Sequence, residues 1–101
     1  MKTLRRYDVR DRLYFITAVT YRREPLLLLD PHLFMRSLGR IEPVAWVLLP
    51  DHFHAILDVG QLSISQMVHT FKIRYSRLFR DQFRPGRVWQ EEVFQESLME
   101  G

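Results

Sequence analysis

The stretch VAWVLLPDHFHAILDV, residues 44–59, predicts two neighbouring strands joined by a tight turn. Its first part, Val44–Leu49, is a continuous apolar run of strand length, which predicts a strand covered on both faces. Pro50-Asp51 interrupts the run, and His52–Val59 then predicts a second strand. The centre of the chain is therefore predicted to be a strand–turn–strand unit.

The residues before this unit predict a strand followed by a helix. Leu13–Tyr21 is rich in aromatic and β-branched residues, which favour a strand, and residues 22–25 interrupt it. Asp30-Pro31 resembles a helix start with proline at the first helical position. Apolar residues follow at helical spacing, and Gly39 stands where this helix is expected to end.

The residues after the unit predict a helix followed by a strand. Ser63 is a candidate N-cap, and apolar residues then recur at intervals of three and four up to about Gln82. Pro85-Gly86 is expected to end this helix, and Val88–Phe94 predicts a fourth strand. The order β-α-β-β-α-β predicts an α+β fold of the ferredoxin-like type, an antiparallel sheet with two helices on one face.

This fold leaves one face of the predicted sheet without a helix. The first two strands are apolar on both faces, although two helices cover only one face. In the third strand, alternation places Phe53, Ala55, Leu57 and Val59 on one face and His52, His54, Ile56 and Asp58 on the other. We therefore expect the histidine-bearing face to be partly covered by a further helix or by a second subunit, so a homodimer is a prediction.

Length and composition restrict the class of protein. The 101 residues are predicted to form a single domain over residues 1–101. The absence of cysteine excludes a disulfide framework, a thiolate nucleophile and a cysteine metal site. No apolar run reaches the roughly 20 residues that span a bilayer, and no signal-peptide apolar stretch follows the basic start. We expect a cytoplasmic protein without a membrane partner.

The charge is distributed unevenly along the chain. The net charge is +3 at pH 7, but residues 69–87 carry one acid and a run of bases. These candidate DNA-binding residues are Lys72, Arg74, Arg77, Arg80, Arg84 and Arg87. Such a run predicts a polyanionic partner, most commonly nucleic acid. Charge alone fits an ordinary solvated helix face equally well.

Two histidines form the candidate metal site. His52-Phe53-His54 places two imidazoles on one strand face, about 7 Å apart along the strand. Such a pair can share one divalent ion, but two ligands hold a metal poorly, so a third group must complete the shell. Asp58 lies too far along the same face, and His32 and His69 are predicted to be ordinary surface or helix residues. On its own, this pattern is more often structural than metal-binding.

Three motifs together resemble one known family. They are the strand–turn–strand unit of residues 45–57, the segment FKIRYSRLF of residues 71–79 and the segment PGRVWQ of residues 85–90. In this order they resemble the HUH-type single-tyrosine transposases, nearest the REP-associated branch. The resemblance implies DNA transposition by nicking and rejoining of single-stranded or hairpin DNA.

The resemblance also implies roles for particular residues. His52 and His54 look like the family's catalytic metal-binding pair, with Mg²⁺ or Mn²⁺ as the usual ion. In the family the ion polarises the scissile phosphate, and a tyrosine attacks it to leave a 5′-phosphotyrosine link and a free 3′-hydroxyl. Asp51 stands where asparagine is more usual and Leu49 where methionine is common, and both are turn or core positions.

The nucleophilic tyrosine of the family has no counterpart in this sequence. The family carries it on a further helix, in a Tyr-x-x-x-Asn-Pro-like motif that also helps to hold the metal, and no such motif precedes Gly101. Tyr75 shares the helical phase of apolar residues and is predicted to be structural, while Tyr7, Tyr14 and Tyr21 lack supporting context. We therefore expect a truncated form, without the tyrosine-bearing C-terminal helix, that is limited to DNA and metal binding.

Two alternatives remain open. A catalytically silent remnant would still bind DNA hairpins through its basic segments. An RNA-binding module shares the β-α-β-β-α-β order, but it stacks bases on strand aromatics in an RNP1-type motif that the predicted third strand lacks.

Overall fold

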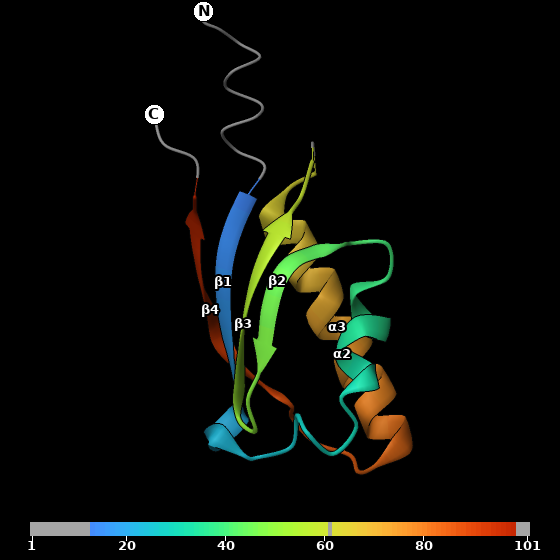
Figure 1. The fold of residues 1–101 in the computed structure, drawn as a ribbon. Coiled ribbons are helices and arrows are strands. Elements are labelled where there is room, and N and C mark those ends of the chain that lie inside the picture. The colour runs from blue at the N-terminus through green and yellow to red at the C-terminus, as the bar shows by residue number, and fades with distance from the viewer. Residues whose placement is uncertain (1–12, 61, 99–101) are drawn as a thin grey trace, which may run out of the picture.

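The computed structural model describes residues 13–60 and 62–98, and Figure 1 shows their arrangement. The elements are strand β1 (Leu13–Thr20), the 3₁₀ turn η1 (Tyr21–Arg23), helix α2 (His32–Leu38), strands β2 (Pro43–Leu48) and β3 (His52–Asp58), helix α3 (Ile64–Gln82) and strand β4 (Trp89–Ser97). The order of strands and helices is the predicted one.

The described strands form one antiparallel sheet with the spatial order β2-β3-β1-β4. Helices α2 and α3 both lie against one face of this sheet (Figure 1). This arrangement confirms the predicted α+β fold of the ferredoxin-like type. The opposite face carries no helix from the described part of the chain.

Both helices begin and end where local signals place them. The backbone N–H of His32 donates to Asp30 Oδ1 (3.1 Å), and α2 ends at Gly39, which has a φ of +63°. Ser63 caps α3, because its hydroxyl accepts a hydrogen bond from the Gln66 N–H (3.3 Å). The predicted limits of α3 are confirmed.

The core lies between the two helices and the sheet, and it is largely aromatic. Phe34 of α2, Phe53 of β3 and Phe71 of α3 contact one another edge to face, with ring centroids 4.9–5.7 Å apart. Trp89 and Tyr75 extend this cluster, and their ring centroids lie 5.2 Å apart. Tyr75 is 1% exposed, so its predicted position on the packed face is confirmed.

The prediction that Val44–Leu49 is covered on both faces is wrong. Val44, Trp46 and Val47 are 61%, 48% and 46% exposed. The physical reason is that β2 is an edge strand, which pairs only with β3 and has an irregularity between Pro43 and Ala45. An apolar run does not distinguish an edge strand from a central one.

The fourth strand is longer than predicted. It begins at Trp89 and continues to Ser97, which pairs with Tyr14 of β1. Glutamates make this segment polar, but its backbone is held by β1 while the side chains remain mostly exposed.

No helix in the described part of the chain is long and apolar enough to cross a membrane.

Candidate metal centre

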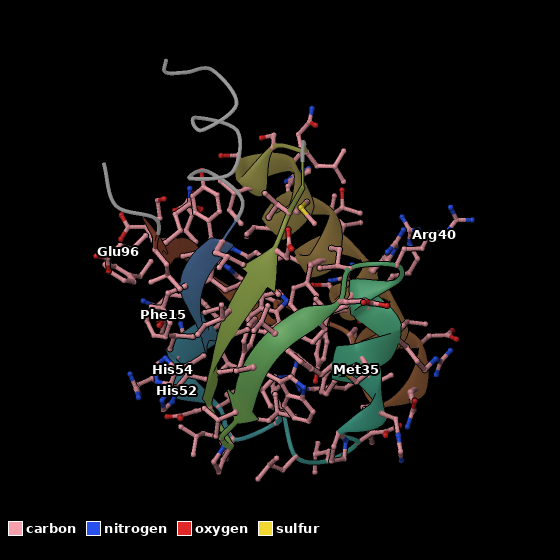
Figure 2. All side chains as sticks on the ribbon, turned by 45° about the horizontal axis from the view of Figure 1, so that its top comes forward. Phe15, Met35, Arg40, His52, His54 and Glu96 are labelled. Carbon is pink, nitrogen blue, oxygen red and sulfur yellow. The ribbon has the colours of Figure 1, made fainter. Side chains whose placement is uncertain are left out.

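His52 and His54 lie on the sheet face away from the helices. Phe15, His54 and His52 follow one another along one side of the molecule in Figure 2, while Met35 of α2 lies on the helical side. Both imidazoles are half-buried, and their ring centroids are 5.0 Å apart with the planes nearly perpendicular. The prediction that the two histidines share the helix-free face is confirmed.

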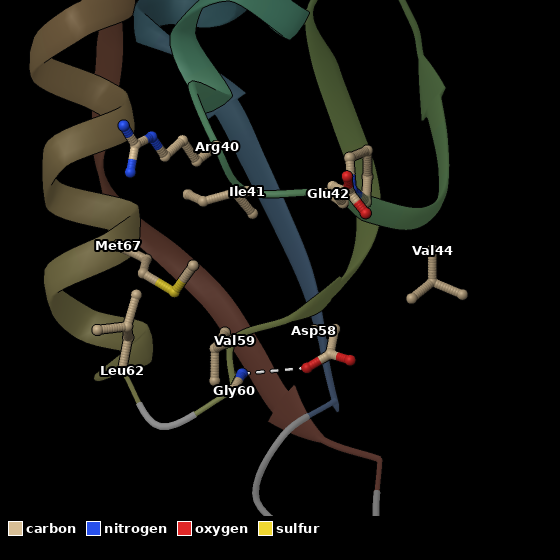
Figure 3. A pocket seen from close by; sticks show the side chains of 10 residues that line it. Arg40, Ile41, Glu42, Val44, Asp58, Val59, Gly60, Leu62 and Met67 are labelled. Atoms are coloured by element: carbon tan, nitrogen blue, oxygen red, sulfur yellow. Dashed lines mark hydrogen bonds between the residues drawn. The ribbon is translucent and has the colours of Figure 1, made fainter.

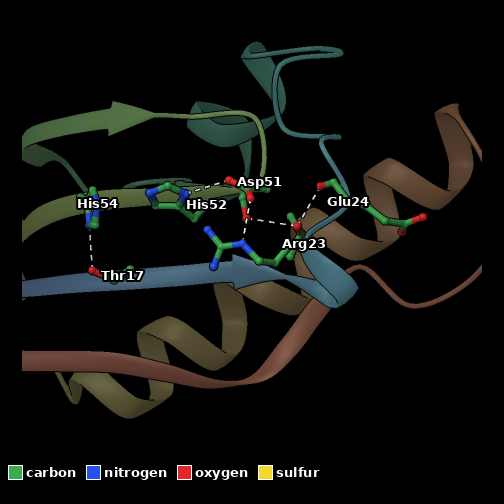
Figure 4. Close-up of polar contacts among 7 residues, drawn as sticks. Thr17, Arg23, Glu24, Asp51, His52 and His54 are labelled. Carbon is green, nitrogen blue, oxygen red and sulfur yellow. Dashed lines mark hydrogen bonds and ion pairs between the residues drawn. The ribbon is translucent and has the colours of Figure 1, made fainter.

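Each imidazole is held through the same ring nitrogen. His52 Nδ1 donates to Asp51 Oδ1 (2.8 Å), and His54 Nδ1 lies 2.8 Å from the Thr17 hydroxyl of β1, as Figure 4 shows. The ring of His54 also stacks on Phe15, with centroids 5.6 Å apart. These contacts leave Nε2 of both rings as the nitrogen for a ligand. A partner on Nδ1 is the usual support of a metal-binding histidine.

Strand register explains why Thr17 meets His54. Thr17 is paired directly with His54 in the β1–β3 ladder, and Val47 is paired with His54 from the other side. Directly opposed residues project their side chains to the same face. The backbone pairing therefore fixes the position of the Thr17 hydroxyl relative to the His54 ring.

Asp51 links the histidine pair to an arginine. Its second carboxylate oxygen, Oδ2, accepts a hydrogen bond from Arg23 Nε (3.0 Å), as Figure 4 shows. The hydrogen bond from His52 holds the pKa of Asp51 below its usual value, and the positive charge of Arg23 acts in the same direction. Asp51 is therefore the ionised group that positions both neighbours.

The turn that carries Arg23 has an unusual backbone. Arg22 and Arg23 have φ values of +56° and +54°, a left-handed region that residues with a Cβ seldom adopt. Thr20 holds the turn in place, because it is fully buried and its hydroxyl shares its proton between the carbonyl oxygens of Glu24 (2.8 Å) and Asp51 (3.1 Å). Positive φ at non-glycine residues is frequently found at functional sites.

The histidine pair fits a metal ion in spacing but not in ligand number. Two imidazoles can share one ion through Nε2, with metal–nitrogen bonds of about 2.1 Å and an N–metal–N angle of about 90–110°. Their ring centroids then lie roughly 4.5–5.5 Å apart. The observed separation of 5.0 Å lies in this range. Over residues 13–60 and 62–98, no group of three or more His, Cys, Asp or Glu side chains is placed to hold an ion. The described residues therefore offer this pair of imidazoles and no third side chain of these types beside it.

Two cavities border the sheet at different distances from the histidines. The hollow beside His54 has a volume of about 250 Å³ and is lined mainly by apolar side chains, including Phe15 and Val47. A larger cavity of about 510 Å³ lies beyond the other end of β3, where Arg40, Asp58 and Met67 line it (Figure 3). Asp58 Oδ1 accepts a hydrogen bond from the Gly60 N–H (3.0 Å), away from the histidine pair, as predicted.

The six candidate DNA-binding residues do not form one surface. Lys72, Arg80 and Arg87 line a common groove between α3 and the start of β4. Arg74 instead turns toward the end of α2, where Nη1 donates to the Ser37 carbonyl oxygen (3.4 Å). Arg84 pairs with Glu24. The remaining residue, Arg77, is exposed on α3.

Four residues of the site were not recognised from the sequence alone. Thr17 and Phe15 support His54, and only the pairing of β1 with β3 brings them there. The sequence alone indicates only that Arg23 interrupts a strand and that Asp51 lies in a turn. Asp51 stands directly before His52 in the sequence, and this adjacency is the one local signal for its contact with the imidazole.

Comparison with known proteins identifies the family. Residues 36–99, more than half of the chain, match the family described as "Transposase IS200 like". A structure of a REP-associated tyrosine transposase bound to a REP hairpin matches with a TM-score of 0.74 and 22% identity, covering 100% of this chain and 64% of that one. This chain thus spans less than two thirds of that relative.

A second structure has the same fold. It is the crystal structure of a protein from Deinococcus radiodurans R1 that is assigned as a transposase, with a TM-score of 0.74 and 23% identity, covering 99% of this chain and 88% of that one. No curated protein matches the sequence significantly. The match over residues 36–99 shows that the chain belongs to the IS200-like transposase family.

Proposed function

We propose that this chain binds single-stranded or hairpin DNA and a divalent metal ion as part of a DNA transposition reaction. The observation that carries the proposal is the geometry of His52 and His54, each fixed through Nδ1 with Nε2 left for a ligand. The pair lies on the sheet face that carries no helix from the described part of the chain, in a fold shared with the transposases. A cytoplasmic location, where DNA is accessible, belongs to the same proposal.

The roles of the side chains follow from their contacts. His52 and His54 would hold Mg²⁺ or Mn²⁺, with Asp51 positioning His52 and Thr17 positioning His54. When bound, such an ion supplies Lewis-acid polarisation of a phosphodiester. Arg23 donates to Asp51 through Nε only, so its remaining N–H groups are donors for a phosphate oxygen beside the histidines.

DNA hairpin binding is supported by one relative and by charge. The REP-associated relative was solved bound to a REP hairpin. In this chain, the bases of α3 and of the following loop provide cations for a phosphate backbone. We propose hairpin or single-stranded DNA as the partner on these grounds.

Strand cleavage through a phosphotyrosine intermediate needs a tyrosine near the histidine pair. Tyr75 is buried on the helical side, and the guanidinium groups of Arg22 and Arg87 both lie over the Tyr21 ring. Tyr7 lies outside the described residues. We propose that these 101 residues by themselves bind DNA and metal without cutting. The same observations favour a second candidate, a hairpin-binding protein without catalytic activity.

A homodimer is also proposed, in which a second copy covers part of the helix-free face. Val47 and Phe94 both project from that face and are 46% and 56% exposed. Burial of such apolar side chains in a subunit interface removes their surface from water, which is favourable.

Metal binding can be tested with the chain's own histidines as controls. Mn²⁺ should broaden the imidazole NMR signals of His52 and His54 selectively, because a paramagnetic ion acts over short distances. The double variant His52→Ala/His54→Ala should lose Mn²⁺ binding in a calorimetric titration. The matched variant His32→Ala/His69→Ala, altered at two exposed helical positions, should retain it. Equal loss or equal retention in the two variants would overturn the proposal.

A further inference from the structure

The two histidines of the candidate metal centre are supported in different ways. His54 lies inside β3, and its ring is held by the Thr17 hydroxyl of the neighbouring strand β1 (2.8 Å). His52 is the first residue of β3, so the position of its ring depends on the turn before it. The group that contacts His52 Nδ1 is the Asp51 carboxylate of this turn (2.8 Å). The orientation of the His52 ring therefore depends on how firmly Asp51 is held.

Thr20, the last residue of β1, holds the main chain of Asp51. Both its backbone N–H (2.9 Å) and its hydroxyl (3.1 Å) donate to the Asp51 carbonyl oxygen. The turn itself is closed by the Leu49 N–H, which donates to the His52 carbonyl oxygen (2.9 Å). Thr20 is 0% exposed, so water cannot replace its hydroxyl as a donor without rearrangement of the core.

The same hydroxyl holds the turn that contacts the Asp51 side chain. It shares its proton with the Glu24 carbonyl oxygen (2.8 Å), which fixes the residue that follows η1. Arg23 of η1 has a φ of +54°, and its Nε donates to Asp51 Oδ2 (3.0 Å). Figure 4 shows both contacts of the Asp51 carboxylate, with Arg23 and with His52. Thr20 therefore supports the main chain of Asp51 and also the turn that carries one of its side-chain partners.

We propose that Thr20 is a positioning residue of the histidine pair, because its hydroxyl holds Asp51 and, through Asp51, keeps the His52 ring oriented with Nε2 toward a metal ion. This inference rests on the proposed metal binding by His52 and His54. It assigns a role to a side chain that contacts neither histidine. The groups that support a metal-binding imidazole affect the affinity for the ion. Loss of the Thr20 hydroxyl should disturb His52 and leave His54 in place, because Thr17 holds His54 from within the sheet.

A hydroxyl that only stabilised the fold would affect both histidines alike, and Ser37 of α2 provides a matched control. Like Thr20, Ser37 is 0% exposed, and its hydroxyl donates to the Leu33 carbonyl oxygen (2.6 Å). Helix α2 lies on the face of the sheet opposite the histidine pair (Figure 2). Ser37→Ala therefore removes a buried hydroxyl of the same kind at a distance from the candidate metal centre.

The first test records the imidazole ¹⁵N NMR signals of the metal-free protein. Thr20→Val replaces the hydroxyl with a methyl group of similar size and keeps the branched side chain. It should change the Nδ1 signal of His52, because the hydrogen bond to Asp51 decides which ring nitrogen carries the proton. The His54 signals should stay as in the wild type, and Ser37→Ala should change neither histidine. Equal changes at both histidines, or an unchanged His52 in Thr20→Val, would overturn the proposal.

The second test measures Mn²⁺ affinity by calorimetric titration. Thr20→Val should weaken binding roughly 3–10-fold, which is less than the 10–100-fold typical of a direct partner of the imidazole. Thr20→Ser keeps the hydroxyl and should bind almost as tightly as the wild type, as should Ser37→Ala. Equal affinities of Thr20→Val and Thr20→Ser would count against the role of the hydroxyl.

Thr20→Cys provides the comparison if Thr20→Val does not fold. A thiol is a weaker donor than a hydroxyl, and cysteine is well tolerated in buried positions. This variant should bind Mn²⁺ less tightly than Thr20→Ser, and an affinity equal to that of Thr20→Ser would refute the proposal. If the wild-type protein binds no Mn²⁺, the proposed metal binding fails, whereas the NMR signals of the metal-free protein still decide whether Thr20 positions His52.

Discussion

Removing the hydroxyl group of Tyr75 should stabilise the protein. Tyr75 is 1% exposed and packs against Phe71, Phe79 and Trp89. Its Oη is buried and has no hydrogen-bond partner among the described residues. A buried hydroxyl without a partner loses its hydrogen bonds to water on folding and gains none in return. Tyr75→Phe removes this cost and keeps the ring.

The expected magnitude follows from two opposing terms. An unsatisfied buried polar group costs about 1–3 kcal/mol. Loss of one oxygen atom leaves a void of roughly 10–15 Å³, which costs only about 0.3 kcal/mol. We therefore expect the free energy of unfolding to rise by about 1 kcal/mol. For a domain of this size, that corresponds to an increase in Tm of about 4–8 °C.

The pH dependence gives an independent check. Burial raises the pKa of the Tyr75 hydroxyl, and the negative charge of Asp30 raises it further. A raised pKa in the folded state means that the folded protein keeps the proton after the unfolded chain has released it. The resulting stability is present below the ordinary tyrosine pKa of about 10 and is lost as the pH rises above it. The advantage of Tyr75→Phe should therefore grow above pH 10.

Urea and thermal unfolding followed by circular dichroism at pH 7 and pH 10.5 would measure both effects. Tyr14→Phe is the control, because Tyr14 is only half-buried and its variant should have nearly unchanged stability at pH 7. If Tyr75→Phe lowers stability by 1 kcal/mol or more, the hydroxyl has a partner and the reasoning is wrong.

Three further outcomes are expected. Asp51→Asn should weaken Mn²⁺ binding about 10–100-fold in a calorimetric titration, because the carboxylate that positions His52 is lost; an unchanged affinity would remove Asp51 from the site. Ser63→Ala should lower the free energy of unfolding by about 1 kcal/mol in urea, because Gln66 loses its capping acceptor, and no loss would mean that the cap contributes nothing. The 101-residue chain should form no covalent adduct with hairpin DNA and Mn²⁺ on denaturing electrophoresis. A shifted band that disappears in Tyr75→Phe would show that Tyr75 is a nucleophile after all.

The sequence predicts those features that depend on residues close together in the chain. Ser63 and the three- and four-residue spacing after it predict the limits of α3 and the burial of Tyr75. Alternation in β3 likewise separates the buried Phe53 from the histidines. In both cases the deciding interactions are periodic and local, so a single segment contains the whole signal.

Features that depend on contacts between segments far apart in the sequence are not predicted. Whether β2 is central or at an edge depends on which strand lies beside it, and its composition is the same in either case. Thr17 reaches His54 only through the register of β1 against β3. Arg23 contacts Asp51 across two turns that are far apart in the sequence, and the buried Thr20 also donates a hydrogen bond to Asp51. These three results follow from tertiary structure and from no pattern within one segment.

The central position of β1 has a consequence for the order of folding. Its neighbours in the sheet are β3 and β4, and the pairing of Tyr14 with Ser97 joins residues near opposite ends of the described chain. Contacts so distant in sequence close large loops and slow the folding of a small domain. During synthesis, β1 emerges first but must wait for β4 before both of its edges are hydrogen-bonded. Until β4 has been synthesised, β1 is an apolar strand with one unpaired edge. The chain is most prone to aggregate during this interval.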